Sequence, residues 1–264
     1  MFRPERGERP RARRQRGGRS CDRPIWFTRS ARSPPPVSSL LMLTNEARHY
    51  IGGAWIGSDS VFDSTNPARQ SEVLGTVHRG SAKEVDAAVA AAREAYRTWR
   101  EESWVSRAEF IDTFAQLVKR DIEEIAALVT RECGKPLNEG RADAVEALHM
   151  AQYVAGMGRM PNGFTVSSEI PAKDAFILRK SKGVIACITP WNFPSAIPLW
   201  VILPAILAGN TVVFKPAEQT PLCGHKLMEL FHEAGFPKGV INLVQGFGEE
   251  VGEPMVRHAH VEAI

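Results

Sequence analysis

Apolar and polar residues are arranged in three different patterns along this chain of 264 residues. From residue 49 to residue 77, short apolar runs are broken by turn residues such as Gly52-Gly53 and Asn66-Pro67. Extended runs separated by turn residues of this kind are typical of hairpins. We therefore expect the first pattern to form β-hairpins.

The second pattern, over residues 81–157, has the spacing of amphipathic helices. Behind Ser81, apolar side chains recur every three or four residues up to Trp99, as on one face of a helix. Two capping boxes, each a serine followed three residues later by a glutamate, predict helix starts at Ser81 and Ser106. Three further features are predicted: a helix restart at Asp121, an end at Gly134 and a third helix over residues 137–157.

Residues 163–179 have the pattern of extended chain, with apolar runs at 164–166 and 175–178. No clear partner strand lies nearby in the sequence. We therefore expect an arm that pairs elsewhere in the chain or across a subunit boundary.

The third pattern begins after residue 182, where strands and helices alternate. Strands are predicted at 184–188, 211–214, 240–244 and 261–264, and helices at 195–208, 220–235 and 249–256. Connections of this length require parallel neighbours, and nearly all-apolar strands are typical of a sheet covered on both faces. The predicted fold class is α/β, a doubly wound parallel sheet of the Rossmann type that breaks off in its fourth strand, preceded by hairpins and a helical region.

The net charge of +3 is misleading, because the basic residues are concentrated at one end. Residues 1–33 hold 11 arginines and 3 acidic residues. From the totals of 33 basic and 30 acidic residues, 22 and 27 remain for the rest of the chain, a charge of −5. A mildly acidic folded part offers no broad surface for nucleic acid.

Residues 1–40 are rich in Arg, Pro, Gly and Ser and cannot bury enough apolar surface to fold. Three interpretations are open: a basic arm for nucleic acid, an Arg-rich transit peptide, and an unstructured extension without function. We favour the disordered basic extension, with Met42 as a natural start of the folded segment.

Cysteine usage and hydropathy bear on location. The four cysteines show no CxxC spacing, which argues against a zinc site and against a disulfide framework. A reducing, cytoplasmic setting fits this pattern best. The most apolar stretch, residues 196–207, is too short to span a membrane and contains two prolines.

Ligand chemistry is expected in the loops after the parallel strands, because open α/β sheets bind ligands at the carboxyl ends of their strands. Lys215 and Glu218 lie three residues apart, just after one strand. Such a pair can hold the two hydroxyls of a ribose, and the carboxylate would repel a 2′-phosphate, which favours NAD over NADP. Taken alone, the pair is explained better by a surface lysine and a glutamate at a helix start.

Two other loops carry weaker signals. The Asn192 amide, between Trp191 and Phe193, can donate to a developing oxyanion, although Asn is also a common turn residue. Residues 246–252 resemble the dinucleotide fingerprint GxGxxG with one residue too many. Taken alone, a plain tight turn explains this segment better.

His258 and His260 are two residues apart and lack a third candidate ligand, so we interpret them as solvated loop histidines and expect no metal site. We interpret the three cysteines of the folded part as structural, because none of them follows a parallel strand: Cys133, Cys187 and Cys223.

Together these segments resemble the aldehyde dehydrogenase superfamily, NAD(P)-dependent enzymes that oxidise aldehydes to acids. The resemblance covers roughly residues 44–264. It rests mainly on residues 188–194 (ITPWNFP), 207–221 (LAGNTVVFKPAEQTP) and 239–244 (GVINLV). The Trp-Asn-Phe-Pro and Lys-Pro-Ala-Glu segments are specific enough to outweigh the simpler explanations of the single residues.

The resemblance implies a role for each candidate residue. Asn192 would supply the oxyanion-hole amide that steadies a tetrahedral thiohemiacetal. The implied NAD-binding residues are Thr189, Pro190 and Trp191 on the nicotinamide side, Lys215, Pro216 and Glu218 at the adenosine ribose, and Gly248 beside the adenine.

It also implies a division of the chain into four parts. These are the extension (1–40), the hairpins and helices of a cofactor-binding domain (41–162), part of an oligomerisation arm (163–182) and an incomplete NAD-binding core (183–264). The parent enzyme is expected to be a homo-oligomer that acts on a small-molecule aldehyde, without nucleic-acid or membrane partners.

The family's nucleophilic Cys and general-base Glu have no counterpart in residues 1–264, so the chain corresponds to about the first half of such an enzyme. We expect it to be inactive by itself, and an exposed edge strand predicts poor solubility. Two alternatives stay open: a non-catalytic fragment that binds NAD or docks onto paralogues, and half of a CoA-acylating semialdehyde dehydrogenase.

Overall fold

The structure, a computed structural model, describes residues 46–264, and the extension expected over residues 1–40 lies outside this range. Short strands come first: β1 (Glu46–Ala47), β2 (His49–Ile51), β3 (Ala54–Ile56), β4 (Val61–Thr65) and β5 (Val73–His78). The predicted hairpins are confirmed, since β2 pairs antiparallel with β3, and β4 with β5. Gly52 and Gly53 both have positive φ at the β2–β3 turn, the conformation that a two-residue type I′ turn requires.

A six-stranded sheet has the order β11-β8-β9-β10-β2-β3. The predicted parallel strands are confirmed: β8 (Val184–Ile188), β9 (Thr211–Lys215), β10 (Ile241–Leu243) and β11 (Val261–Ala263). The sequence did not indicate that the β2–β3 hairpin extends this sheet, with β2 antiparallel to β10. The sheet is therefore mixed, and its parallel part lies at one side.

The helices of residues 46–264 follow the predicted order. They are α1 (Ala82–Trp99), α2 (Trp104–Arg120), α3 (Ile122–Cys133), α4 (Leu137–Met157), α5 (Ala196–Leu207), α6 (Pro221–Glu233), the single π-helical turn η3 (Gly248–Gly252) and α7 (Glu253–Arg257).

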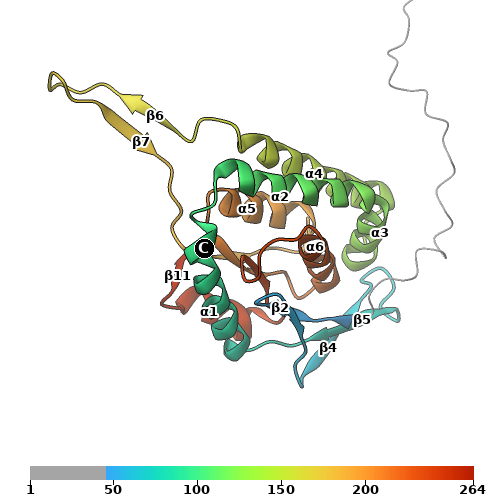
Figure 1. Cartoon of the computed structure of the whole chain (residues 1–264). Coiled ribbons are helices and arrows are strands. Elements are labelled where there is room, and N and C mark those ends of the chain that lie inside the picture. Colours follow the sequence, from blue (N-terminus) through green and yellow to red (C-terminus); the bar gives the residue numbers. More distant parts are fainter. Residues whose placement is uncertain (1–45) are drawn as a thin grey trace, which may run out of the picture. The chain divides into compact units, whose positions relative to one another are not determined.

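Both faces of the sheet are covered by helices (Figure 1). On one face α1, η3 and α7 pack over a core that includes Val213. On the other face α5 and α6 cover the neighbouring residues Val212 and Phe214, and α2, α3 and α4 pack against these two helices. Adjacent residues of β9 therefore enter different cores, which explains why the strands are apolar on both faces.

The first capping box is confirmed and the second is wrong. Ser81 and Glu84 form the reciprocal hydrogen bonds that start α1. In α2, however, the cap is Ser103, whose hydroxyl oxygen accepts from the Ser106 backbone N–H at 3.0 Å. The earlier start brings Trp104 into the helix, where its ring packs against the main core.

The segment expected to be an arm without a nearby partner forms a hairpin with itself. β6 (Gly163–Val166) pairs antiparallel with β7 (Ala175–Leu178), in a separate two-stranded sheet. The expectation that no strand nearby pairs with it is therefore wrong, because a loop of eight residues was long enough to hide the pairing in the sequence. Apolar side chains stay exposed on both strands: Phe164, Val166, Phe176, Ile177 and Leu178.

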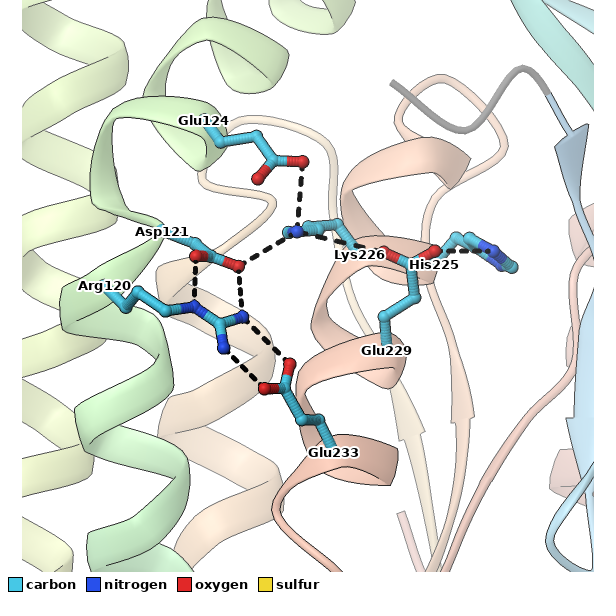
Figure 2. A network of polar contacts seen from close by, with 7 residues as sticks. All are labelled: Arg120, Asp121, Glu124, His225, Lys226, Glu229 and Glu233. Carbon is cyan, nitrogen blue, oxygen red and sulfur yellow. Dashed lines mark hydrogen bonds and ion pairs between the residues drawn. The ribbon is translucent and has the colours of Figure 1, made fainter. Parts of the chain in front are cut away.

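Charged residues connect the α2–α3 junction to α6 (Figure 2). Asp121 lies at the predicted start of α3, but its side chain makes no capping hydrogen bond. Instead its carboxylate binds Arg120 at 2.7 Å and Lys226 at 3.1 Å. Lys226 also binds Glu124 at 3.0 Å, and Arg120 binds Glu233. These ion pairs fix α6 against the outer helices.

Candidate functional site

The parallel register brings the ends of β8 and β9 to the same edge of the sheet. Ile188 is paired with Lys215, the last residue of β9. The backbone N–H of Thr189 then donates to the Lys215 carbonyl at 3.2 Å. The loops after β8, β9 and β10 therefore start side by side, at what we call the carboxyl edge of the sheet.

Lys215 and Glu218 contact each other at this edge. The Lys215 side chain is 3% exposed, and its Nζ donates to the Glu218 carboxylate at 3.0 Å and to the Pro216 carbonyl at 2.8 Å. Burial by itself raises the pKa of Glu218, but hydrogen bonds from its own backbone N–H and from Lys215 outweigh burial, so the pKa lies below its ordinary value. The pair is thus a buried ammonium and an ionised, partly exposed carboxylate.

The loop after β8 is exposed where it carries its polar group. Trp191 is 54% exposed, and Pro190 and Asn192 are exposed as well. Within residues 46–264 the Asn192 carboxamide makes no hydrogen bond, so its N–H groups remain available to a ligand. Thr189 and Pro216, in contrast, are buried.

Two residues beside Gly134 hold the backbone of this loop. Lys135 Nζ donates to the Asn192 carbonyl at 2.7 Å and lies 4.6 Å from the centre of the Phe193 ring. The Cys133 thiol donates to the Trp191 carbonyl at 3.3 Å. Neither contact was predicted from the sequence. In the sequence, the only sign of these contacts was the Gly-Lys-Pro turn that ends α3. The loop residues that it contacts, Trp191 and Asn192, lie more than fifty residues further along the chain.

The three described cysteines have the properties of structural residues. Burial raises the pKa of Cys133 to about 12 and that of Cys187 to about 12. The pKa of Cys223, which is completely buried, is also raised by burial. A thiol that stays protonated at neutral pH is a poor nucleophile.

The glycine-containing loop after β10 differs from the predicted helix over residues 249–256. It forms the π-helical turn η3, followed by the five-residue α7. A π turn accommodates one residue more than an α turn, and the extra residue of this segment relative to GxGxxG falls within η3. Gly248 begins η3, and a Cβ atom there would meet open space.

Gly252, at the end of η3, lies within van der Waals range of the Lys215 side chain. A Cβ atom at Gly252 would lie 3.7 Å from Cδ of Lys215 and 4.0 Å from Cδ1 of Ile188. The loop after β10 is therefore packed directly on the Lys215 side chain.

Glu132 is a further residue at this edge that was not predicted from the sequence. Its carboxylate accepts from the backbone N–H groups of Leu222 and Cys223 at 2.9 and 2.7 Å, and from the Ser64 hydroxyl at 2.8 Å. It thereby fixes the N-terminus of α6, directly after the Lys215–Glu218 loop. A cavity of about 400 Å³ lies between Glu132, Glu218 and Phe247.

Some of the candidate residues contact one another in the structure, and others do not. Lys215, Pro216 and Glu218 contact one another, and Thr189 is linked to them through the backbone. Trp191 and Asn192 are held by Cys133 and Lys135 instead.

His258 lies 3.4 Å from Asp86, and residues 46–264 contain no group of three or more metal-ligating side chains. In this same range, the helices are too short or too polar to cross a lipid bilayer.

The aldehyde dehydrogenase family model matches residues 55–264. With the doubly covered parallel sheet and the residues at its carboxyl edge, this match shows that the chain belongs to the aldehyde dehydrogenase family.

Two curated relatives come from Bacillus subtilis (strain 168). An alpha-ketoglutaric semialdehyde dehydrogenase is 38% identical over 228 residues, which make up 86% of this chain and 47% of the relative. A betaine aldehyde dehydrogenase is 39% identical over 219 residues, 81% of this chain and 44% of the relative. The chain thus spans about half the length of the curated relatives it matches.

Solved structures show the same partial coverage. Betaine aldehyde dehydrogenase from Staphylococcus aureus, in complex with NAD⁺, is 37% identical with a TM-score of 0.79, and the match covers 85% of this chain and 45% of that one. Proline utilization A from Bdellovibrio bacteriovorus is 35% identical with a TM-score of 0.80, and the match covers 85% of this chain and 24% of that one. The predicted fold, part of an aldehyde dehydrogenase, is confirmed.

Proposed function

We propose that this chain is the N-terminal, NAD-binding part of an aldehyde dehydrogenase that oxidises an aldehyde to a carboxylic acid. The observation that carries the proposal is the Lys215–Glu218 pair, because it places a buried ammonium and an ionised carboxylate together after a parallel strand. Ligands of open α/β sheets bind at this edge. The NAD⁺ complex of the Staphylococcus aureus relative supports the same cofactor.

The two side chains suit the hydroxyl groups of a ribose. Glu218 keeps acceptor capacity beyond its bond to Lys215, and its side chain is 28% exposed, so a ligand can reach it. An ionised carboxylate here would repel a 2′-phosphate, which favours NAD over NADP. When bound, NAD would supply the hydride acceptor of the reaction. In this proposal Pro216 shapes the Lys215 site and Gly248 lies beside the adenine.

The loop after β8 would act on the aldehyde and on the nicotinamide end of the cofactor. Asn192 is proposed to donate its free carboxamide N–H to the oxygen that becomes negative in the tetrahedral intermediate. The bond from Lys135 to the Asn192 carbonyl fixes the backbone that carries this amide. Thr189, Pro190 and Trp191 are proposed to line the nicotinamide side.

The nucleophile is proposed to lie outside these 264 residues, since burial keeps the described thiols protonated. The chain by itself is then expected to produce no NADH from a panel of aldehydes. Turnover clearly above that of a boiled sample would contradict this expectation. The cytoplasmic setting, the division at residues 41–162, 163–182 and 183–264, and a homo-oligomeric parent enzyme all stay predictions.

An NAD titration of the purified chain tests the cofactor site. Glu218→Gln keeps the side-chain shape and removes the charge, and Lys215→Met keeps most of the packing. We expect each variant to weaken NAD binding by about tenfold or more, since hydrogen bonds to charged groups are worth about 1.5–3 kcal/mol.

Glu218→Gln should also reduce the preference for NAD over NADP, because the repulsive charge is gone. Lys119→Met, which changes an exposed lysine on α2, is the control and should leave NAD binding unchanged. Equal NAD affinity of the wild type and both site variants would overturn the proposed cofactor role.

A further inference from the structure

We propose that a second cavity, at the edge of the sheet opposite the candidate cofactor site, binds a phosphate group, either free phosphate or the end of a small phosphate monoester. The cavity has a volume of about 380 Å³, within the range of roughly 300–1,000 Å³ typical of small-molecule sites. We call it the basic cavity. The inference does not depend on the proposed cofactor site.

The basic cavity lies between the ends of α1 and α5, the start of α2 and the connector that follows β7. The connector is fixed at the amino ends of β8 and β9, where Asn210 accepts from the backbone N–H groups of Lys182 and Gly183. Five-residue strands separate this edge from Lys215 by about 16 Å. A ligand here would not contact the Lys215–Glu218 pair.

Positive charge dominates the lining. Four cationic side chains, Arg100, Arg107, Arg179 and Lys180, face a single carboxylate, Glu101. That carboxylate is already bound to Arg100 Nε at 2.8 Å. Arg179 and Lys180 are exposed, and neither forms an ion pair with a residue in the range 46–264. Three positive charges are therefore left without a carboxylate partner in the cavity wall.

Arg107 gives the cavity a fixed, buried donor. It is 3% exposed, and its Nε donates to the Leu207 carbonyl at 2.7 Å. Nη1 donates to the carbonyls of Trp99 and Glu102. These carbonyls hold the guanidinium in place, and Nη2 makes no hydrogen bond to any residue of the described part of the chain. Burial lowers the pKa of Arg107, as expected for a guanidinium without a bound carboxylate.

The helix ends at the cavity have opposite effects on an anion. The C-terminal ends of α1 and α5 contribute partial negative charge, but Arg107 neutralises their carbonyls at Trp99 and Leu207. The N-terminal end of α2, with Trp104 as its first residue, contributes partial positive charge and first-turn N–H groups. The balance favours an anion.

Phosphate fits this set of donors better than a single carboxylate does. The Arg179 guanidinium can bind phosphate oxygens with two parallel hydrogen bonds, whereas Arg107 offers Nη2 alone, and a doubly charged anion compensates most of the excess positive charge. The remaining volume, with the side chains of Tyr96 and Trp104 in the wall, leaves room for a small organic group beyond the phosphate.

Calorimetric titration of the chain with inorganic phosphate and with glycerol phosphate tests the proposal, at constant ionic strength set with chloride. Saturable binding of phosphate is expected, with acetate binding weakly or not at all. Tighter binding of glycerol phosphate would identify a monoester as the ligand, and tighter binding of inorganic phosphate would identify free phosphate.

The variant Arg179→Gln/Lys180→Gln should weaken phosphate binding by about tenfold or more, because it removes two charged donors. Both residues are exposed, so the fold is retained, which circular dichroism checks. The matched control Lys119→Gln/Lys173→Gln also removes two exposed charges, outside the cavity, and should bind phosphate like the wild type.

Absence of saturable phosphate binding, or equal loss in both double variants, would overturn the proposal. The Lys215→Met and Glu218→Gln variants should bind phosphate normally. A failure of the cofactor proposal can therefore be distinguished from a failure of this one.

Discussion

At the residue scale, the Glu132 carboxyl connects three segments that the sequence keeps far apart. It lies at the end of α3, and its hydrogen bonds reach Ser64 in β4 and the first turn of α6. Burial raises the pKa of Glu132 to about 7, although the hydrogen bonds from Cys223, Leu222 and Ser64 act in the opposite direction. The loop that carries Lys215 and Glu218 depends on this anchor.

The raised pKa predicts a pH-dependent contribution to stability. Because the folded-state pKa of about 7 exceeds the ordinary value of 4.5, the protonated form favours the folded state. This contribution is fully present below pH 4.5 and is lost as the pH rises through about 7. Glu132→Gln stays neutral throughout. The free energy of unfolding of the wild type should therefore fall relative to that of the variant, by up to about 3 kcal/mol.

Urea unfolding of both proteins near pH 4.5 and above pH 7 measures this difference. Subtracting the variant cancels the contributions of the other titrating groups. A difference that stays constant across this range of pH would show that Glu132 is not titrating there.

Within the candidate site, the Lys215–Glu218 pair was easier to predict from the sequence than the surroundings of Trp191 and Asn192. Lys215 and Glu218 are three residues apart, so local spacing was sufficient to place both after the same strand, but it predicted neither the contact between them nor the burial of Lys215. The contacts of Asn192 and Trp191 with Lys135 and Cys133 depend on how α3 packs against the loop after β8. Glu132 could have been noticed, because it falls on the apolar stripe of α3 with Leu128 and Val129.

At the scale of elements, the helices were predicted well where one local signal prevailed. Both Ser103 and Ser106 are possible caps of α2, and the local pattern did not show that the helix begins at Ser103, with Trp104 packed against the core. The β6–β7 pairing and the addition of β2 to the large sheet were missed because pairing depends on chain reversal and on long-range contacts. Periodicity alone contains neither kind of information.

The ion pairs between α3 and α6 (Figure 2) give an element-scale prediction. Burial lowers the pKa of Lys226, but its bonds to Glu124 and Asp121 outweigh burial and keep it charged. Lys226→Met would remove the cation that Glu124 and Glu229 share and would leave Asp121 paired with Arg120 alone. We expect the free energy of unfolding to fall by about 2 kcal/mol.

Denaturant unfolding at neutral pH measures this loss, and Lys119→Met, on the exposed face of α2, is the control. The loss should shrink in acid, where the carboxylates are protonated and no longer repel one another. A loss of the same size in the control, or none in Lys226→Met, would show that the ion pairs do not stabilise the α3–α6 packing.

At the scale of the whole molecule, the β6–β7 hairpin forms a two-stranded sheet of its own, separate from the large sheet. Its pairing places Phe164 beside Ile177 and Thr165 beside Phe176, so adjacent residues put apolar groups on both faces. Phe164 is 63% exposed and Phe176 is 67% exposed. Exposed apolar surface of this kind marks an interaction site, and unpaired strand edges accept further strands.

We therefore expect the chain to self-associate through this hairpin, in keeping with the proposed oligomerisation arm. Phe164→Ser with Phe176→Ser removes one large apolar side chain from each face and should raise the dissociation constant of the assembly by at least about tenfold, since burying one Phe is worth about 1.5–3 kcal/mol. Sedimentation velocity over a range of concentrations measures this change. Tyr153→Ser, which removes an equally exposed ring from α4, is the control. A wild type that stays monomeric, or a double variant that associates like the wild type, would place the contact elsewhere.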